Sequence, residues 1–177
     1  SQIDGSGKNP NDYAVGYMWG TTGFLYNTRY VTEEEVSTWS ALWNKKFDKK
    51  LLIKDAFRDV YSPLLIYANQ DRLRAGEITM QDLMHDSSDE SIATVEALLK
   101  KAKPYVAGWE ADFGKEQMTK ELAWLNLSWS GDAQWAIDEA AEIGMELRYA
   151  IPQTGSSVWF DGWVIPKYAK NIKAARY

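Results

Sequence analysis

The amino-acid sequence predicts an α/β layered domain, in which helices cover a β-sheet. Segments that alternate apolar and polar residues take turns along the chain with segments whose apolar residues recur at helical spacing. The chain has 177 residues, the size of one ordinary domain with a sizeable core. Its 45% hydrophobic and 25% charged residues are the mix of a folded globular protein. Disorder is therefore not expected.

The N-terminal part of the sequence divides into a connector and a strand region. Residues 1–12 have the glycine, serine, asparagine and proline composition of a flexible linker, so we expect the ordered domain over 13–177. The next stretch, AVGYMWGTTGFLYN, is rich in strand formers and contains Gly16, Gly20 and Gly23. These glycines predict two extended segments around a bend.

The middle of the chain contains one predicted strand between helices. TWSALWNKKF predicts a short helix with Thr38 as its N-cap, and KKLLIKD predicts a brief buried strand. AFRDVYSPLLIYANQDRL is helical in pattern, and its Pro63 either removes one backbone hydrogen bond or marks a break. SSDESIATVEALLKKAKP is the clearest helix, because Ser87 or Ser88 can cap it and Pro104 follows its closing lysines.

The C-terminal third alternates helices and strands. GKEQMTKEL predicts a short helix, and AWLNLSWS predicts a strand in which Ala123, Leu125, Leu127 and Trp129 share one face. SGDAQWAIDEAAEIG predicts a helix that ends at Gly144. MELRYAIP and SSVWFDGWVIP are the last predicted strands, and KYAKNIKAARY begins a further helix.

Composition disfavours several classes of function. The chain has 20 Lys and Arg against 25 Asp and Glu, a formal charge of −5, so it lacks the basic surplus that meets nucleic-acid phosphates. It has no cysteine, and its single histidine, His85, lies without a GxSxG sequence or a metal-ligand spacing. No nucleotide-binding motif appears, so we expect neither a metal nor a cofactor. No membrane-spanning run or signal peptide is recognisable either.

The stretch VWFDGW places a carboxylate among aromatic rings. In a strand, Trp159, Asp161 and Trp163 share one face, and Val158 and Phe160 share the other. Two indoles around an acid can bind an organic cation. The same residues can also be structural, with rings in a core and the acid capping a loop.

Two other stretches resemble VWFDGW in their chemistry. KDAFRDVY and LSWSGDAQW each place an acid or a tryptophan where a predicted strand ends and the next helix begins. Ligands of α/β sheets gather at this edge. Together the three stretches predict a cleft suited to alkylammonium groups, with ring faces over the methylenes and acids at the charged ends.

Four blocks of the sequence, in order, resemble the spermidine/putrescine-binding proteins of bacterial ABC importers. They are YAVGYMWGTTGFLYN, TWSALWNKKFDKKLLIKDAFRDVY, LNLSWSGDAQ and VWFDGWVIPKYAKN, and they are spread along the chain from Tyr13 to Asn171. The resemblance implies a two-lobed fold in which each lobe is a mixed central sheet flanked by helices. It covers the second lobe and the start of a helix returning to the first, so the chain is expected to be an isolated lobe.

The resemblance also implies which residues contact the ligand. Trp129 and Trp159 match the two tryptophans that pack on the polyamine, and Asp161 matches an acid that receives an amine. Asp59 stands where the family has glutamate after arginine, so its reach is one methylene shorter. Asp55 is close to another family acid but displaced from it. No family role attaches to Trp163, for which we expect core packing.

The resemblance further implies a non-catalytic function, the capture of a polyamine for delivery to permease subunits. The parent protein is expected to be periplasmic or extracellular and anchored as a lipoprotein. Without the first lobe, we expect weak ligand binding and possible self-association through the exposed cleft face. Two alternatives remain open on the residues alone, a tryptophan-rich carbohydrate-binding module and a glycosidase that uses Asp59 and Asp161.

Overall fold

The computed structural model describes residues 9–175, and the chain divides into two compact units. Unit 1 consists of Ser1–Gly20 and Val158–Tyr177, and unit 2 consists of Thr21–Ser157. Of the expected N-terminal linker, residues 1–8 lie outside the described residues. The rest of it forms a single 3-10 turn over Pro10–Asp12, which the side chain of Asn9 caps.

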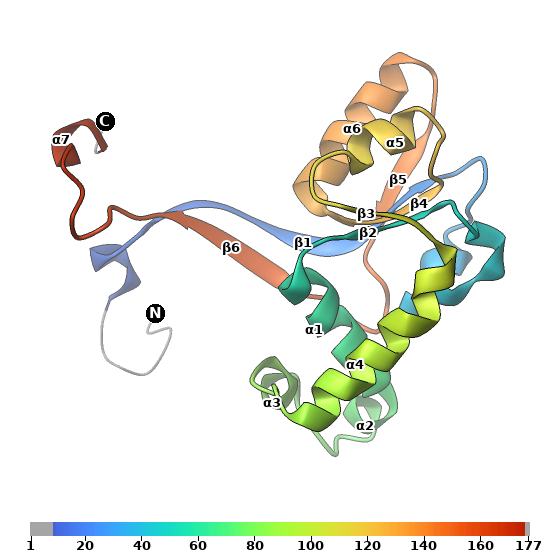
Figure 1. Cartoon of the computed structure of the whole chain (residues 1–177), viewed down its shortest axis with the longest axis horizontal. Helices are drawn as coiled ribbons and strands as arrows, with labels where there is room; N and C mark the ends of the chain where they lie inside the picture. Colours follow the sequence, from blue (N-terminus) through green and yellow to red (C-terminus); the bar gives the residue numbers. More distant parts are fainter. Residues whose placement is uncertain (1–8, 176–177) are drawn as a thin grey trace. The chain divides into compact units, whose positions relative to one another are not determined.

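Unit 2 is built on a mixed β-sheet (Figure 1). The strand order is β3-β2-β4-β1-β5, and strand β6 pairs with β1 as well. β2 runs parallel to β3 and β4, whereas β1 is antiparallel to β4 and β5. The prediction of a mixed sheet is therefore confirmed. The strands are β1 (Val15–Asn27), β2 (Leu51–Lys54), β3 (Val106–Glu110), β4 (Leu125–Trp129), β5 (Leu147–Ala150) and β6 (Val158–Trp163).

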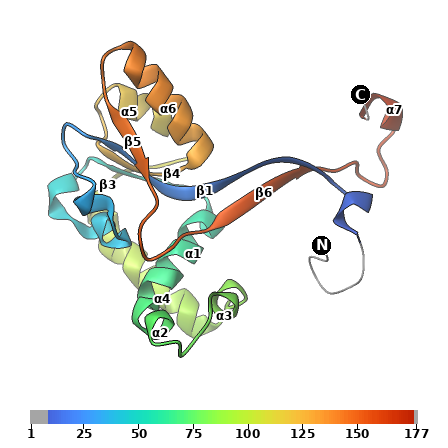
Figure 2. The ribbon, with the colours of Figure 1, turned by 180° about the vertical axis from the view of Figure 1, so that it is seen from behind.

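Helices cover both faces of the unit 2 sheet (Figures 1 and 2). α5 and α6 lie on one face, and α1 and α4 lie on the other. None of the helices within 9–175 is long and apolar enough to cross a membrane. The helices are α1 (Phe57–Ala68), α2 (Gln70–Arg74), α3 (Met80–Met84), α4 (Asp89–Ala102), α5 (Gly114–Thr119), α6 (Ser130–Glu142) and α7 (Ile172–Ala175), with 3-10 turns at Glu34–Val36, Trp39–Trp43, Lys45–Phe47 and Lys103–Tyr105.

Two hydrophobic clusters form the core, one on each side of the sheet. The α1/α4 side is filled by large side chains, among them the fully buried Trp39. On the α5/α6 side, Ala133, Ala136 and Ala140 of α6 are fully buried, as the helical spacing predicts. Their small size lets the helix approach the strands closely. Because both faces are covered, β4 is buried on both sides, including the polar Asn126.

The caps predicted from the sequence are present. Thr38 caps the turn Trp39–Trp43, and the hydroxyl of Ser88 accepts a hydrogen bond from the backbone of Ser91 at the start of α4. α6 ends at Glu142, and Gly144 follows with φ of +73°. These elements depend on residues close to one another in the chain.

The predicted bend in the first strand is wrong, because β1 is continuous over its 13 residues. Gly23 serves a different purpose. A Cβ atom at Gly23 would lie 2.6 Å from the carbonyl oxygen of Ala150 and 2.7 Å from the ring of Tyr149. The glycine is therefore required by the close approach of β5. Pro63 likewise does not break α1, which continues to Ala68 at the loss of one backbone hydrogen bond.

Unit 1 pairs β6 with β1. The prediction that Trp163 packs in a core is wrong, since its side chain is 66% exposed and contacts Tyr17 edge-to-face at 5.1 Å between ring centroids. Val158 and Phe160, on the opposite face, are exposed too. Without a covering helical layer, this pair of strands leaves Trp163 exposed.

The close packing of Tyr149 predicts a loss of stability at alkaline pH. Burial raises the pKa of the Tyr149 phenol to about 12, and its hydroxyl donates a hydrogen bond to the carbonyl of Thr21 at 3.0 Å. The unfolded chain loses this proton near pH 10. The protonated phenol therefore contributes fully to the free energy of unfolding below pH 10, and this contribution is lost as the pH rises toward 12. The loss is at most about 2 kcal/mol for a half-buried group.

Urea unfolding of the wild type and of Tyr149→Phe between pH 9 and 11.5 measures this contribution. Tyr26 and Tyr61 contribute in the same direction, because burial raises their pKa values as well, and they are present in both proteins. The free energy of unfolding should fall less steeply with pH in Tyr149→Phe. Equal slopes would contradict the prediction.

Candidate functional site

Three strands of unit 2 bring their carboxyl ends to one edge of the sheet. β2 is parallel to both β3 and β4, so the last residues of these strands, Lys54, Glu110 and Trp129, lie at the same edge. Helices α1, α5 and α6 begin shortly after them. This edge carries most of the charged and aromatic side chains that are candidates for ligand binding.

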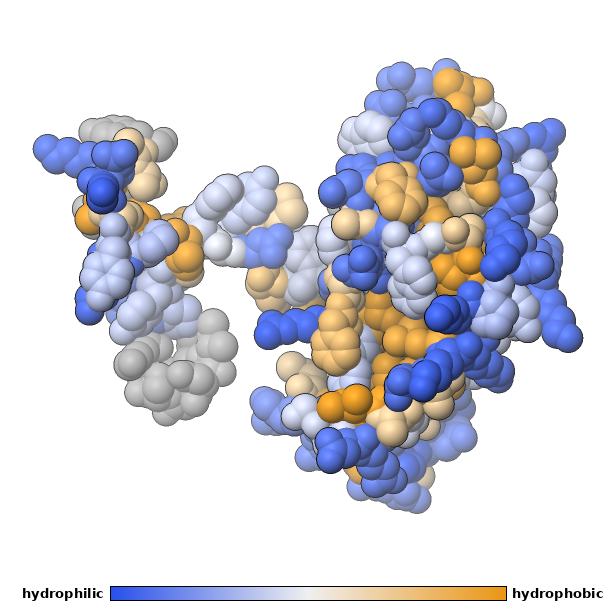
Figure 3. Space-filling view, in the orientation of Figure 1, coloured by the Kyte–Doolittle hydropathy of each residue, from blue (hydrophilic) through white to orange (hydrophobic). Residues whose placement is uncertain are grey.

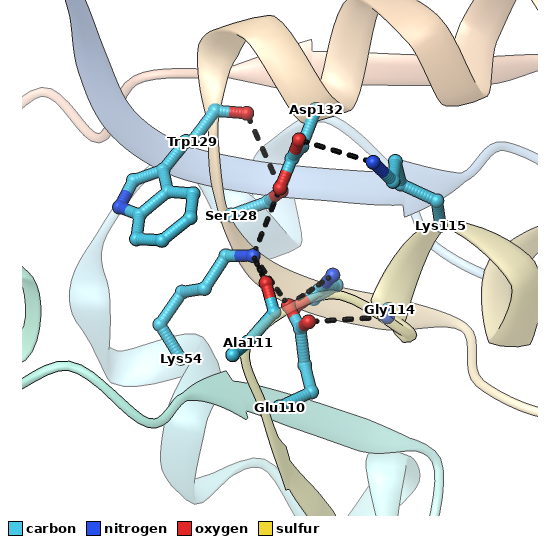
Figure 4. Close-up of polar contacts among 9 residues, drawn as sticks. Lys54, Glu110, Ala111, Gly114, Lys115, Ser128, Trp129 and Asp132 are labelled. Atoms are coloured by element: carbon cyan, nitrogen blue, oxygen red, sulfur yellow. Dashed lines mark hydrogen bonds and ion pairs between the residues drawn. The ribbon is translucent and has the colours of Figure 1, made fainter.

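The ammonium of Lys54 lies at the centre of this edge (Figure 4). Its Nζ atom donates to the carbonyl oxygen of Ala111 at 2.8 Å and to Oδ2 of Asp132 at 3.0 Å. It also lies 3.0 Å from Oε1 of Glu110 and 4.0 Å from the ring centroid of Trp129. The Lys54 side chain is only 1% exposed. A buried cation thus has carboxylates and an indole face as its neighbours.

Glu110 is fixed from several directions. Its side chain is fully buried, Oε2 accepts a hydrogen bond from the backbone N–H of Gly114 at 3.1 Å, and Oε1 accepts one from the amide of Asn126 at 3.2 Å. A Cβ atom at Gly114 would lie 2.5 Å from the Glu110 carboxylate. Only glycine therefore lets the first turn of α5 close on this acid.

Asp132 joins the same cluster from the first turn of α6. Its Oδ1 lies 3.4 Å from Nζ of Lys115, and its Oδ2 lies 3.0 Å from Nζ of Lys54. Two ammonium groups thus meet two carboxylates. We refer to Lys54, Glu110, Lys115 and Asp132 as the charge cluster. Since its formal charges cancel, it adds no net negative charge to the sheet edge.

Trp129, predicted to contact a ligand, is the last residue of β4 and is half-buried. One face of its ring is occupied by Lys54. The backbone beside it is anchored, since Oγ of Ser130 accepts a hydrogen bond from the N–H of Thr21 at 3.1 Å. Trp129 therefore lies at the end of its predicted strand. The sequence did not suggest its contact with Lys54.

Asp55 and Asp59 follow Lys54 in the chain. Asp55 is exposed at the end of β2, and its backbone N–H donates to the carbonyl of Glu110 at 2.8 Å. Asp59 is half-buried in the first turn of α1. A carboxylate in the first turn of a helix is stabilised by the helix dipole. Both predicted acids are thus present at the edge where β2 leads into α1.

A recess of about 220 Å³ opens beside Asp55. Figure 3 shows hydrophobic side chains gathered between α1 and α4 on this face. The ring of Phe57 stacks on that of Tyr61, with 5.0 Å between centroids, and the hydroxyl of Tyr61 donates to the carbonyl of Asp86. The recess is lined by Lys54, Asp55, Ala56, Phe57, Val60, Tyr61, Val95, Leu99 and Trp109.

Unit 1 holds the other two predicted residues, Trp159 and Asp161. Both are on β6, and their spacing places them on the same face of the strand. Asp161 is exposed, whereas Trp159 is half-buried. The indole nitrogen of Trp159 is buried and has no hydrogen-bond partner among residues 9–175. A buried donor without an acceptor is uncommon in folded proteins.

The acids of the chain divide into compensated and free ones. Glu110 and Asp132 are paired with lysines in the charge cluster. Within the described part of the chain, the carboxylates of Asp55, Asp59 and Asp161 form no ion pair and no side-chain hydrogen bond. Free carboxylates retain their charge and acceptors for a ligand.

Sequence reasoning missed the charge cluster. Lys54 is the last residue of a strand predicted to be buried. A lysine is rarely buried without an acidic partner, so Lys54 was the residue that could have indicated the cluster. Glu110 was harder to recognise, because its strand, β3, was not predicted.

No group of three or more His, Asp or Glu side chains in the described ranges could hold a metal ion. His85 is exposed, with Nδ1 lying 3.0 Å from the carbonyl oxygen of Gln81.

Comparison with known proteins decides the family. A family model described as bacterial extracellular solute-binding protein matches residues 2–176. The chain belongs to this family. Among its curated relatives, the spermidine/putrescine-binding periplasmic protein of Salmonella typhimurium is 26% identical over 168 residues. The putrescine/agmatine-binding protein of Pseudomonas aeruginosa is 26% identical over 174 residues. The resemblance inferred from the sequence blocks is thereby confirmed.

Solved structures give the same result for the fold. The spermidine/putrescine ABC transporter substrate-binding protein of Streptococcus pneumoniae superposes with a TM-score of 0.69 at 25% identity, over 93% of this chain and 46% of that one. The PBP MotA of A. tumefaciens, solved in complex with glucopine, superposes with a TM-score of 0.71 at 17% identity, over 99% of this chain and 54% of that one. The second match shows the fold alone.

The chain spans less than half the length of these curated relatives. It aligns over 93% of its own length but only 43% of the Salmonella protein, and over 91% against 44% for the Pseudomonas protein. The expected single lobe agrees with this coverage. The ligand and partners of a whole two-lobed protein are therefore matters for proposal.

Proposed function

We propose that this chain is the second lobe of the polyamine-binding component of an ABC importer, which captures spermidine or putrescine and delivers it to permease subunits without chemical change. The alignment to spermidine- and putrescine-binding relatives over 93% of the chain carries the proposal. Those relatives are named as periplasmic proteins. The parent protein would act in the periplasm or at the extracellular surface, anchored there as a lipoprotein.

The free carboxylates support a cationic ligand. Asp161 and Asp59 would each accept a charge-assisted hydrogen bond from an amine, and Asp55 would add a third acceptor. Trp159 and Trp129 are the rings that we expect to pack on methylene groups of the ligand. Each of these uncompensated negative charges would disfavour an anionic ligand.

One lobe alone should bind weakly. A hydrogen bond to a charged group contributes about 1.5–3 kcal/mol and a cation–π contact about 0.5–2 kcal/mol, and immobilising the ligand opposes both. Micromolar binding corresponds to about −8 kcal/mol, so a lobe that supplies half of this would have a dissociation constant near 1 mM or weaker.

Ligand titration of the chain tests this proposal. Thermal melting and ligand-detected NMR with spermidine and putrescine, at constant ionic strength, should show binding in the millimolar range. Asp161→Asn should remove most of it, because a neutral amide cannot form the ion pair. Asp48→Asn is the matched control, an exposed acid before the opposite end of β2, and should change nothing.

The same variants separate the alternatives. A carbohydrate-binding module would retain ligand binding in Asp161→Asn, and a glycosidase would hydrolyse chromogenic glycosides with a loss in both Asp59→Asn and Asp161→Asn. Micromolar binding of spermidine by the wild-type chain would contradict the expected weakness of a single lobe. Equal polyamine binding by Asp161→Asn and Asp48→Asn would contradict the assigned site.

A further inference from the structure

The surroundings of Lys54 have the composition of a complete site for a primary ammonium. Such a group has three N–H donors. The Nζ atom has three acceptors within 3.0 Å, the Ala111 carbonyl and the carboxylates of Glu110 and Asp132, and the Trp129 ring supplies a cation–π contact at 4.0 Å (Figure 4). The ammonium that fills this site is that of Lys54, a residue of the protein itself.

The site is built and enclosed. Lys54 and Glu110 are nine-tenths buried or more, and Glu110 is held by Gly114 and Asn126 independently of the lysine. The carboxylate would therefore remain in place if the ammonium were absent. An acid and an aromatic ring so arranged would attract any alkylammonium of suitable length.

We propose that Lys54 is a tethered occupant of an alkylammonium subsite and determines which amines the sheet edge accepts. Its ammonium uses the acceptors of Glu110 and Asp132 and one face of Trp129. A free ligand at this edge must therefore place its charges elsewhere, at Asp55 or Asp59. The consequence for ligand choice rests on the proposed function, whereas the occupancy of the subsite by Lys54 does not.

Removing the tether tests the proposal. Lys54→Ala deletes three carbons and the nitrogen, which is the composition of n-propylammonium. We expect n-propylammonium chloride to raise the melting temperature of Lys54→Ala saturably. Tetramethylammonium chloride at equal ionic strength should not, because it has no N–H donor. The wild type and Lys46→Ala, which loses an exposed lysine paired with Glu35, should show no saturable shift with either salt.

A second variant covers the case in which Lys54→Ala does not fold. Lys54→Ala/Glu110→Gln removes the buried negative charge but retains Asp132 and Trp129. It should bind n-propylammonium about tenfold or more weakly than Lys54→Ala where both fold, since one charge-assisted hydrogen bond is lost. If only the double variant folds, it should still prefer n-propylammonium to tetramethylammonium.

Equal shifts with the two salts, or no shift in any variant that folds, would overturn the proposal. Failure of both variants to fold at any n-propylammonium concentration would also overturn it, because a built subsite should recover structure when filled. None of these results depends on polyamine binding by the wild type. Failure of the proposed function would appear instead as unchanged spermidine titrations in Asp161→Asn.

Discussion

Replacement of Lys54 by methionine should lower the free energy of unfolding by about 3–5 kcal/mol, because removing one partner of a buried ion pair leaves an uncompensated charge. Glu110 is the acid affected, since its side chain is fully buried and Lys54 is its ion-pair partner. Asp132 is affected less, because Lys115 lies 3.4 Å from its other oxygen. Methionine retains most of the side-chain volume, so the effect is one of charge.

Urea unfolding at neutral pH measures the loss. The matched control is Lys46→Met, in which the lysine is 43% exposed and pairs with Glu35 at 2.8 Å; it should cost about 1 kcal/mol or less. In the double variant Lys54→Met/Glu110→Gln, the second substitution should recover part of the loss. A cost for Lys54→Met equal to that of Lys46→Met, or strict additivity in the double variant, would refute the role given to this pair.

Replacement of Trp39 by alanine should lower the free energy of unfolding by about 3–5 kcal/mol, the range for a large side chain deleted from a core. The indole is fully buried, its centroid lies 4.8 Å from that of Phe24, and its Nε1 donates to the carbonyl of Gly155 at 2.9 Å. The residue thus joins the first strand to the segment after β5, and its loss leaves both a cavity and an unpaired carbonyl.

Trp135→Ala is the comparison for Trp39→Ala. Trp135 is 47% exposed on α6, where Nζ of Lys115 lies 5.2 Å from its ring centroid, so its removal should cost about 1 kcal/mol or less. Chemical denaturation of both variants, followed by circular dichroism to avoid the altered tryptophan signal, gives the comparison. Similar costs for the two would show that Trp39 does not organise the core.

The elements that the sequence predicted well are those specified by nearby residues. α4 has a capping serine before it and lysines at its end, and α6 has alanines on one face and Gly144 after it. Strand β3, VAGWE, was not predicted, because it contains glycine and ends in an acid, and its pairing with β2 is parallel and distant in sequence. The glycines of β1 were misread as a bend, since the demand for a small residue at Gly23 comes from β5.

The residues of the candidate site were likewise only partly predicted from the sequence. The sequence named Trp129, Asp59, Asp55, Trp159 and Asp161, and these assignments stay predictions until binding is measured. Trp163 was assigned to a core, which is wrong, because a strand pair without a helical layer leaves it exposed. Lys54 and Glu110 were not named at all.

By itself, the sequence determined the α/β class, the ends of α4 and α6, and the family, because caps, hydrophobic periodicity and ordered blocks are properties of the sequence along the chain. Only the tertiary structure decided that Lys54 meets Glu110 and Asp132. Lys54 and Asp132 are 78 positions apart, and parallel strands bring them to one edge. Whether an acid is free for a ligand or already neutralised depends on contacts of a few ångströms, which no local pattern encodes.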